Sequence, residues 1–502
     1  MVKKLLDTLA SKKFFYLLVA LLVAQAAWIA LSGRYPMAFD EDFHLGIIRL
    51  YSHHWLPFWS SQPSNADVFG AVYRDPSYLY HYLMSFPYRL IRLFTSDTTV
   101  QVLVLRFLNI ALFATALPLY RRLLLKTGAS ARTAHVVLTL FVLVPIVPFL
   151  AAQINYDNLF IPLVALVLLL ALSVQNSMRA DGPLNVVRLT QLITIGLLAC
   201  LVKYVFLPIL LAVFVFLAVQ AYRYLGKRHT FWRGLGLGVS QVGKRRRWLL
   251  VGLLVVSVGL FGERYAINAV RYHQLVPSCD KVLSVQRCKT YGPWNRDYNF
   301  ALIKDDRHDN PLTYSTDWFY GVWFRTFFAV DGPASNFETR GPLVIPALGA
   351  IVLAGFGLVT FLIWSRRIFA RYNRDVLGLF GLVLAIYVAV LWLDNYQAYT
   401  RTGQPVAISG RYLLAVYPLL MLMLALGYKA ALGRRPRLQL AVAVVAVLAF
   451  MWGGGALTYI LRSRDAWLWP NSGVQRANND VRQWLAPVVP GSRKPVEFLP
   501  KS

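Results

Sequence analysis

Three consecutive carboxylates, Asp40, Glu41 and Asp42, follow shortly after the first long apolar stretch of the chain, and His44 lies two residues further on. Charged side chains at the edge of a bilayer are costly, so this cluster favours a functional role. A partly buried carboxylate could take a proton from an incoming hydroxyl group as a general base, or it could bind a divalent cation. The alternative is a solvated turn in which Glu41 or Asp42 caps the next helix.

Two further polar positions are predicted at the depth of Asp40. Asp157 belongs to a short Asn- and Asp-rich turn between two apolar runs, where it could complete a joint carboxylate site or form an ordinary turn. Lys203 and Tyr204 also stand between two apolar runs. The ammonium group could neutralise a lipid-linked phosphate, whereas the alternative is a side chain that snorkels to the headgroups.

A third polar stretch, residues 399–412, contains Arg401, Arg411 and Tyr412. We expect Gly410, Arg411 and Tyr412 to open a transmembrane helix. There, Arg411 could donate two hydrogen bonds to a phosphate, with help from the positive N-terminus of the helix. The alternative is an interfacial anchor formed by the arginine and the tyrosine.

The elements that would position these residues are membrane-spanning helices. The 502 residues are 57% hydrophobic, and apolar runs of bilayer length recur along the chain. We therefore predict an all-α polytopic membrane protein with about eleven spans. Arg106 falls inside one of them, so it is expected to face the bundle interior, to snorkel, or to pair with an acid of the first loop. The predicted spans are 14–33, 98–120, 133–152, 158–174, 188–202, 204–222, 248–262, 342–364, 376–393, 411–428 and 438–460.

Basic residues predict the orientation. If residues 1–13 are cytoplasmic, the predicted inner loops contain 26 of the 52 Lys and Arg residues but only three of the 23 acids. This distribution predicts a multi-pass protein of the inner cell membrane with a cytoplasmic N-terminus and the carboxylate cluster outside. It also explains the net charge of +29 without nucleic-acid binding. The tail 461–502 is basic as well and fits the outer side less well.

We divide the chain into an N-terminal transmembrane module (1–262), an extracytoplasmic loop (263–341), C-terminal transmembrane helices (342–460) and a tail (461–502). The first external loop, 34–97, is predicted to contain two interfacial helices, at 45–59 and 78–94, because apolar, aromatic and basic residues are mixed there. Cys279 and Cys288 in the second loop could form a disulfide or remain free thiols.

The chain has no nucleotide-phosphate loop, no HExxH motif and no GxSxG elbow. Its motifs resemble those of the GT-C superfamily of polytopic glycosyltransferases, whose donors are polyprenyl-phosphate-linked sugars. The likeness rests on Asp40-Glu41 at the start of a long first external loop, on the interfacial helices predicted after it, and on Asp75–Tyr80. Arg106, Asn155–Asn158 and Ser409–Tyr412 are similar to an uncharacterised bacterial branch of predicted membrane proteins in the same superfamily.

The resemblance implies a GT-C bundle that transfers a sugar to an extracytoplasmic glycan, lipid or protein. Asp40 would be the base or the acceptor-orienting carboxylate, and Lys203 and Arg411 would contact the donor phosphate. Other candidate substrate-binding residues are His44, Asp157, Tyr204, Arg401 and Tyr412. Two features depart from the family: the acidic motif is Asp-Glu-Asp, which leaves the catalytic member open, and there is no large soluble carboxy-terminal domain.

Two other classes remain open. A transporter or flippase of lipid-linked saccharides would also place polar residues at one membrane face, but transporters often show internal repeats and broken helices. No repeat is evident here, which favours an enzyme. A non-catalytic scaffold of the cell envelope is the third reading, and in that case replacing Asp40 would have no effect.

Overall fold

The computed structural model of the chain is predominantly α-helical and describes residues 2–179, 183–225, 228–304, 310–330, 339–340, 344–433, 435–470 and 472–489. Seven helical segments in these ranges have the length and hydropathy needed to cross a bilayer. This agrees with the all-α polytopic architecture predicted from the sequence. The seven segments are Lys12–Ser32, Thr98–Leu125, Asp157–Arg179, Tyr204–Tyr224, Lys244–Tyr272, Ile345–Ile363 and Arg374–Thr402.

Four shorter apolar helices of 10 to 17 residues coincide with the remaining predicted spans. They are Ala131–Leu143, Val186–Val202, Tyr417–Ala431 and Pro436–Met451. Because they are shorter than a bilayer normally requires, the count of eleven spans stays a prediction.

The helical elements of the first half, in chain order, are α1 (Val2–Ala10), α2 (Lys12–Ser32), α3 (Glu41–Ser52), η1 (Asp67–Phe69), η2 (Val72–Arg74), α4 (Leu79–Arg92), α5 (Thr98–Ala114), α6 (Ala116–Leu125), α7 (Ala131–Leu143), α8 (Ile146–Ala151), α9 (Asp157–Arg179), α10 (Val186–Val202), η3 (Tyr204–Phe206), α11 (Leu207–Leu225), α12 (Arg228–Ser240) and α13 (Lys244–Phe261). A π-helical turn, η4 (Gly262–Ala266), joins α13 to α14 (Ile267–Tyr272).

The elements that follow are α15 (Cys279–Val282), α16 (Val285–Cys288), α17 (Gly292–Leu302), α18 (Pro311–Phe324), α19 (Val344–Ile363), α20 (Ser365–Arg371), α21 (Arg374–Thr402), η6 (Gly410–Leu413), α22 (Tyr417–Ala431), α23 (Pro436–Met451), α24 (Leu457–Arg462), η7 (Asp465–Trp467) and α25 (Ser472–Leu485). Two short antiparallel strands, β1 (Ala329–Val330) and β2 (Thr339–Arg340), pair with each other. Residues 490–502 of the predicted tail and 342–343 of a predicted span lie outside the described residues.

Two predicted spans are interrupted rather than continuous. The span predicted at 133–152 breaks between α7 and α8, because Val144 precedes Pro145 and adopts an extended conformation. The span predicted at 438–460 breaks between α23 and α24, where Gly453 and Gly455 adopt positive φ angles that favour glycine.

The two interruptions contact each other. The backbone N–H of Gly455 donates to the carbonyl of Leu143 at 2.6 Å. Gln25 of α2 spans both breaks: its amide group donates to the carbonyl of Val142, and its side-chain oxygen accepts from the N–H of Ala456. Backbone groups freed by the breaks are thus satisfied inside the bundle, as an apolar environment requires.

Two predicted boundaries were wrong. The first interfacial helix covers residues 41–52 rather than 45–59, whereas the second, α4, covers 79–92, close to the predicted 78–94. Gly410 to Leu413 form a 3-10 turn, and the following helix, α22, begins only at Tyr417, where Pro418 occupies the first turn. Arg411 therefore does not lie at the N-terminus of a transmembrane helix.

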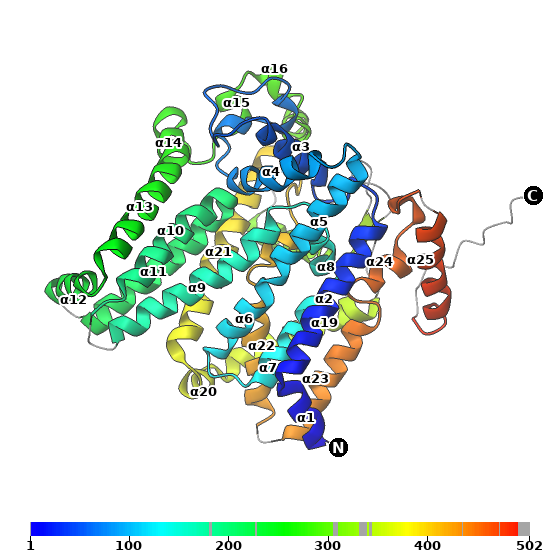
Figure 1. Ribbon diagram of the computed structural model, residues 1–502. Helices are drawn as coiled ribbons and strands as arrows, with labels where there is room; N and C mark the ends of the chain where they lie inside the picture. Colours follow the sequence, from blue (N-terminus) through cyan, green and yellow to red (C-terminus); the bar gives the residue numbers. More distant parts are fainter. Residues whose placement is uncertain are drawn as a thin grey trace, which may run out of the picture.

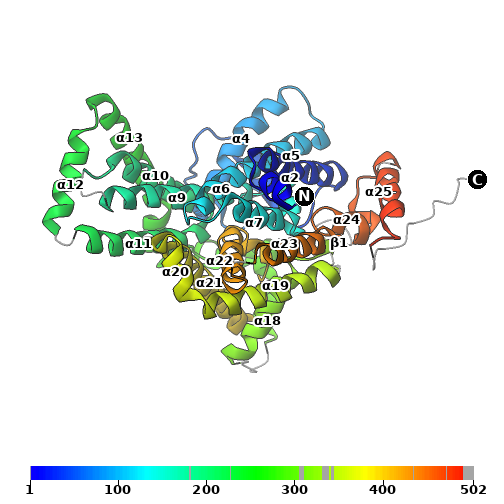
Figure 2. The same ribbon diagram turned by 90° about the horizontal axis from the view of Figure 1, so that it is seen from below.

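The bundle has two distinct ends. Figure 1 shows α3, α4, α15 and α16 gathered at one end, whereas α1 and α20 lie at the opposite end, where the N-terminus of the chain is found. The long helix α9 packs against α5, α6, α10 and α11, and α2 packs against α5, α7 and α8. Seen from below, α9 lies near the middle of the assembly, and α25 projects at one side (Figure 2).

One face of α4 is apolar and exposed. Leu83, Leu90 and Leu93 are 45%, 57% and 79% exposed, and the guanidinium of Arg89 lies 4.2 Å from the ring centroid of Trp55. A short helix that exposes leucines beside an arginine and a tryptophan is typical of the membrane–water interface. The interfacial position of this segment stays a prediction.

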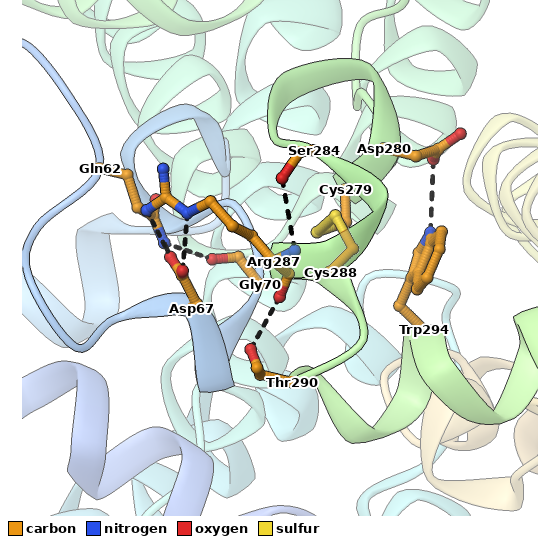
Figure 3. Close-up of a disulfide and its surroundings, with 10 residues drawn as sticks. All are labelled: Gln62, Asp67, Gly70, Cys279, Asp280, Ser284, Arg287, Cys288, Thr290 and Trp294. Carbon is orange, nitrogen blue, oxygen red and sulfur yellow. Dashed lines mark hydrogen bonds and ion pairs between the residues drawn. A yellow bond between two sulfur atoms is a disulfide. The ribbon is translucent and has the colours of Figure 1, made fainter.

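A disulfide joins Cys279 and Cys288 within the 263–341 segment, beside the first loop (Figure 3). Next to it, Arg287 donates two hydrogen bonds of 2.7 Å to the carboxylate of Asp67. This guanidinium holds the pKa of Asp67 below its usual value. Tyr73 of the first loop packs against the small apolar cluster around the disulfide.

Removing this disulfide is expected to destabilise the protein. The double variant Cys279→Ser/Cys288→Ser should lose about 2–3 kcal/mol of unfolding free energy, because the short covalent loop no longer restricts the unfolded chain. Thermal unfolding of the purified protein in detergent measures the change. A reductant should lower the unfolding temperature of the wild type and leave that of the double variant unchanged. An equal response of both proteins would contradict a disulfide in the folded protein.

Candidate functional site

Glu41 and Arg106 form an ion pair with both side chains fully buried. The guanidinium donates from Nε to Oε1 at 2.8 Å and from Nη2 to Oε2 at 2.7 Å, and its Nη1 donates to the carbonyls of Ala30 and Gly33 at the end of α2. The backbone N–H of Met37 donates to the same carboxylate at 2.8 Å. Because both of its oxygens accept hydrogen bonds, the Glu41 carboxylate fixes the position of the C-terminal end of α2 relative to α5 and α3.

Asp40 is held differently. Its side chain is 52% exposed, and one oxygen accepts a 2.8 Å hydrogen bond from Nη2 of Arg411, whose side chain is 8% exposed. Phe39 and Asp40 both adopt the left-handed conformation, with φ near 70°. Two consecutive non-glycine residues in this region are strained, by about 1–3 kcal/mol each, and such strain clusters at functional sites.

The strained turn is secured through one carbonyl group. The carbonyl of Phe39 accepts hydrogen bonds from Nη1 of Arg411 and from the side-chain amide of Asn155, both at 3.1 Å. Asn155 precedes α9, and Arg411 belongs to η6, so distant parts of the chain hold the Asp40 backbone in place. The exposed carboxylate is therefore presented by a rigid, buried support.

Lys203 and Asp157 form a second ion pair, and it is buried. The distance between the lysine Nζ and Oδ1 of Asp157 is 2.5 Å, and each side chain is 2% exposed. Lys203 ends α10 as its C-cap residue, and Asp157 begins α9. The ammonium group lies 4.6 Å from the ring centroid of Tyr156 and 5.1 Å from that of Tyr412, distances at which a cation is attracted to a ring.

These two cation–carboxylate pairs belong to one cluster. The guanidinium of Arg411 lies 5.1 Å from the ring centroid of Tyr412, the ring that Lys203 also approaches. Contacts therefore run without interruption from Asp40 through Arg411, Tyr412 and Lys203 to Asp157. We call these five residues the Asp40 cluster. It brings together two acids and two cations that the sequence placed in four separate segments.

His44 lies beside the Asp40 cluster and pairs with His81. Nδ1 of His44 is 2.8 Å from Nε2 of His81, and both side chains are buried. The ring of His44 also meets the ring of Tyr156 edge-on, at a centroid distance of 4.6 Å. Burial lowers the pKa of His81 to about 3 and lowers the pKa of His44 well below its ordinary value. The pair is therefore neutral at pH 7.

This buried pair predicts a loss of stability in acid. Both histidines are neutral when folded but titrate near 6.5 when unfolded, so protons bind preferentially to the unfolded state below that pH. The stability contribution is complete above about pH 6.5 and falls as the pH drops towards 3. We expect the unfolding temperature in detergent to fall by several degrees from pH 7 to pH 4.5.

The double variant His44→Gln/His81→Gln should show a shallower dependence of unfolding temperature on pH than the wild type. His53→Gln, which changes an exposed histidine of the same segment, is the matched control and should follow the wild type. Identical slopes in the double variant and the control would show that the pair does not set the acid response.

Three predicted site residues lie apart from the cluster or at its edge. Arg401 is exposed on the last turn of α21, and no contact found among the described residues joins it to the cluster. Asp42 is exposed in the first turn of α3 and makes no hydrogen bond or ion pair within the described chain. Tyr204 directly follows Lys203 of the cluster in the chain, and its backbone N–H donates to the hydroxyl of Ser77, outside the cluster, at 3.0 Å.

The divalent cation predicted near Asp40 receives no support from the side-chain arrangement. Within the described ranges, no three His, Cys, Asp or Glu residues are grouped as metal ligands. The carboxylate of Asp40 is paired with a guanidinium instead.

Sequence reasoning missed several polar residues that support the cluster. Asn109 accepts from the hydroxyl of Tyr80 at 2.7 Å and from the side-chain amide of Asn158 at 3.0 Å. Its position one turn after Arg106 in an apolar helix was a usable signal. His81 was hidden within an aromatic segment, and only the fold brings it to His44.

Some buried polar atoms around the cluster have no protein partner within the described chain. They are Nε of Arg411, Oδ2 of Asp157, Oδ1 of Asn158 and both polar atoms of the Gln153 side chain. Buried polar groups normally find partners, so these atoms are candidates for binding oxygen or hydroxyl groups of a ligand.

Comparison with known proteins adds no assignment: no model of a protein family matches this chain, and no curated protein is significantly similar to it in sequence. The fold and the cluster define the class of the molecule only as an all-α polytopic membrane protein with a charged site at one end of the bundle.

Proposed function

We propose that this protein is a membrane glycosyltransferase of the GT-C type, which moves a sugar from a polyprenyl-phosphate donor to a hydroxyl group of an extracytoplasmic glycan, lipid or protein. One observation carries the proposal. An exposed carboxylate on a strained turn, Asp40, stands in direct contact with a buried arginine, in one cluster with a buried lysine, at one end of a membrane bundle.

The proposed reaction assigns the base to Asp40. Its carboxylate takes the proton from the acceptor hydroxyl, whose oxygen forms a bond to the anomeric carbon of the sugar. The bond from that carbon to the phosphate oxygen breaks, and polyprenyl phosphate leaves with the bonding electrons. Arg411 and Lys203 stabilise the departing phosphate, for which the unpartnered Nε of Arg411 is an available donor.

The neighbouring acids receive different roles in this proposal. Glu41 is a positioning residue, because both of its oxygens already accept hydrogen bonds from Arg106. Asp157 holds Lys203 in the cluster, and Asp42 is the remaining exposed carboxylate near Asp40. The exposed apolar face of α4 would lie in the interface, where a polyprenyl chain could reach the cluster.

The proposed location is the inner cell membrane, with the N-terminus in the cytoplasm and the Asp40 cluster outside. The excess of Lys and Arg in loops at the opposite end supports this orientation. So does the disulfide at the α3/α4 end, since disulfides persist in oxidising compartments.

A specific observation favours a second candidate, a flippase of lipid-linked saccharides. The interruptions between α7 and α8 and between α23 and α24 contact each other inside the bundle. Transporters often build their binding sites from such discontinuous helices.

One assay separates the two candidates. The purified full chain is reconstituted in liposomes with undecaprenyl-phosphate-linked glucose, mannose, galactose or arabinose, each labelled in the sugar, together with a panel of soluble glycan acceptors. A transferase releases undecaprenyl phosphate and moves the label to an acceptor. A flippase moves intact donor between leaflets. If all four donors remain intact while the labelled donor moves between the leaflets, the transferase proposal is overturned.

A further inference from the structure

A cavity of about 610 Å³ lies between α6, α9 and α10, away from the Asp40 cluster. Helix α9 packs against both α6 and α10, and we call the residues that α9 contributes to the lining the floor of the cavity. Leu166 and Leu169 of α9 and Leu125 of α6 contribute apolar surface. We call this cavity the α6/α9/α10 groove.

Three cations border the groove. They are Arg122 and Lys126, at the end of α6, and Arg188, in the first turn of α10, and all three are exposed. Arg188 donates to the side-chain oxygen of Gln191 at 3.0 Å. Within the described ranges, none of the three forms an ion pair with a carboxylate. The mouth of the groove is therefore positive, while its floor is apolar.

The groove lies far from the Asp40 cluster along the bundle axis. Asp157 of the cluster begins α9, and Leu166 and Ser173 of the groove follow 9 and 16 residues later on the same helix. At a rise of 1.5 Å per residue, the groove occupies a depth of roughly 14–24 Å from the cluster. It therefore opens near the other membrane surface, at the basic end of the bundle.

The residues that line the groove are spaced so that those from one helix lie on one face of that helix. Leu119, Arg122 and Lys126 are separated by three and four residues on α6 and its C-cap, and Leu166, Leu169 and Ser173 are similarly spaced on α9. Each set thus faces the same groove. A ligand that fits it must combine an anionic head with an apolar chain.

We infer that the α6/α9/α10 groove binds an anionic phospholipid. Its phosphodiester lies between Arg122, Lys126 and Arg188, and one acyl chain lies along the leucines of α9. Basic pockets between transmembrane helices are suited to such headgroups, and each nearby Lys or Arg strengthens the attraction. A free phosphate ion would leave the leucine floor unoccupied. This inference is independent of the proposed function.

Native mass spectrometry of the purified full chain tests the inference. The protein in detergent is incubated with phosphatidylglycerol, with phosphatidylcholine or with soluble glycerophosphoglycerol at equal concentrations. We expect one retained phosphatidylglycerol, with about tenfold or greater preference over phosphatidylcholine. Retention equal for both lipids, or saturation by the soluble headgroup alone, would overturn the proposal.

Two variants locate the lipid. Arg122→Gln/Lys126→Gln/Arg188→Gln should lose the preference for phosphatidylglycerol. Leu166→Trp, which fills the floor without changing charge, should lower its retention severalfold. The matched control is Lys244→Gln/Arg245→Gln/Arg246→Gln, which removes three exposed cations from the start of α13 and should behave as the wild type. Loss of retention in the control, or wild-type retention in either groove variant, would exclude this site.

Discussion

The variant Asp40→Asn is expected to lower the rate of sugar transfer by about 10²–10⁴-fold, the range attributable to one positioned general base. The amide keeps the size of the side chain and can still accept a hydrogen bond from Arg411, so folding should be preserved. The measurement is the release of undecaprenyl phosphate in the liposome assay, together with thermal unfolding of the same preparation.

Asp42→Asn is the matched control, because Asp42 is also exposed and lies on the same helix turn. It should retain transfer activity. If Asp42→Asn abolishes transfer while Asp40→Asn does not, Asp42 is the base. If both variants remain fully active, neither carboxylate takes the proton, and the assignment of the base to this acidic motif is wrong.

The second large effect concerns stability rather than turnover. Arg106→Met would leave Glu41 buried and charged without its cation, and Glu41→Gln would leave Arg106 without its anion. Breaking a buried pair in this way is expected to cost about 3–5 kcal/mol in each single variant. Unfolding of the purified protein in detergent, followed by tryptophan fluorescence, measures these losses.

The double variant Glu41→Gln/Arg106→Met should be destabilised by clearly less than the sum of the two single variants, because no unpaired charge remains. Arg296→Met is the control, since the ion pair of Arg296 with Asp297 is solvent-exposed and should be worth at most about 1 kcal/mol. Strictly additive losses at Glu41 and Arg106 would show that the two charges do not depend on each other.

The sequence predicted the helical architecture well because the length of each apolar run matches the thickness of the bilayer core. The prediction of continuous spans was wrong where single residues change the direction of the backbone. Neither the break at Pro145 nor the one at Gly453 to Gly455 interrupts the apolar composition, so hydropathy alone gives continuous spans there. The bonds that make these breaks tolerable come from Gln25, more than one hundred residues away.

The site was predicted in its residue types, but its pairing was predicted only in part: Arg106 was expected to pair with an acid of the first loop, and it pairs with Glu41. The acids and cations at 40, 157, 203 and 411 were expected to converge, and the fold brings them into one cluster. Spacing could not reveal that Glu41 belongs to Arg106, 65 positions later, while Asp40 belongs to Arg411. Nor could it show that Arg401 stays apart from the cluster, since the nine residues between Arg401 and Arg411 leave the direction of its side chain open.

The contact between Asp40 and Arg411 also bears on how the protein is made. The two residues are 371 positions apart, so a ribosome delivers the acid long before its guanidinium partner. During most of synthesis the Asp40 turn must therefore exist with the Asn155 amide as a donor to the Phe39 carbonyl but without Arg411. A nascent chain released before η6 is synthesised would insert its early helices, but its Asp40 turn would lack the hydrogen bonds from Arg411. The early part of the chain therefore reaches its final structure only after the late helices have been made.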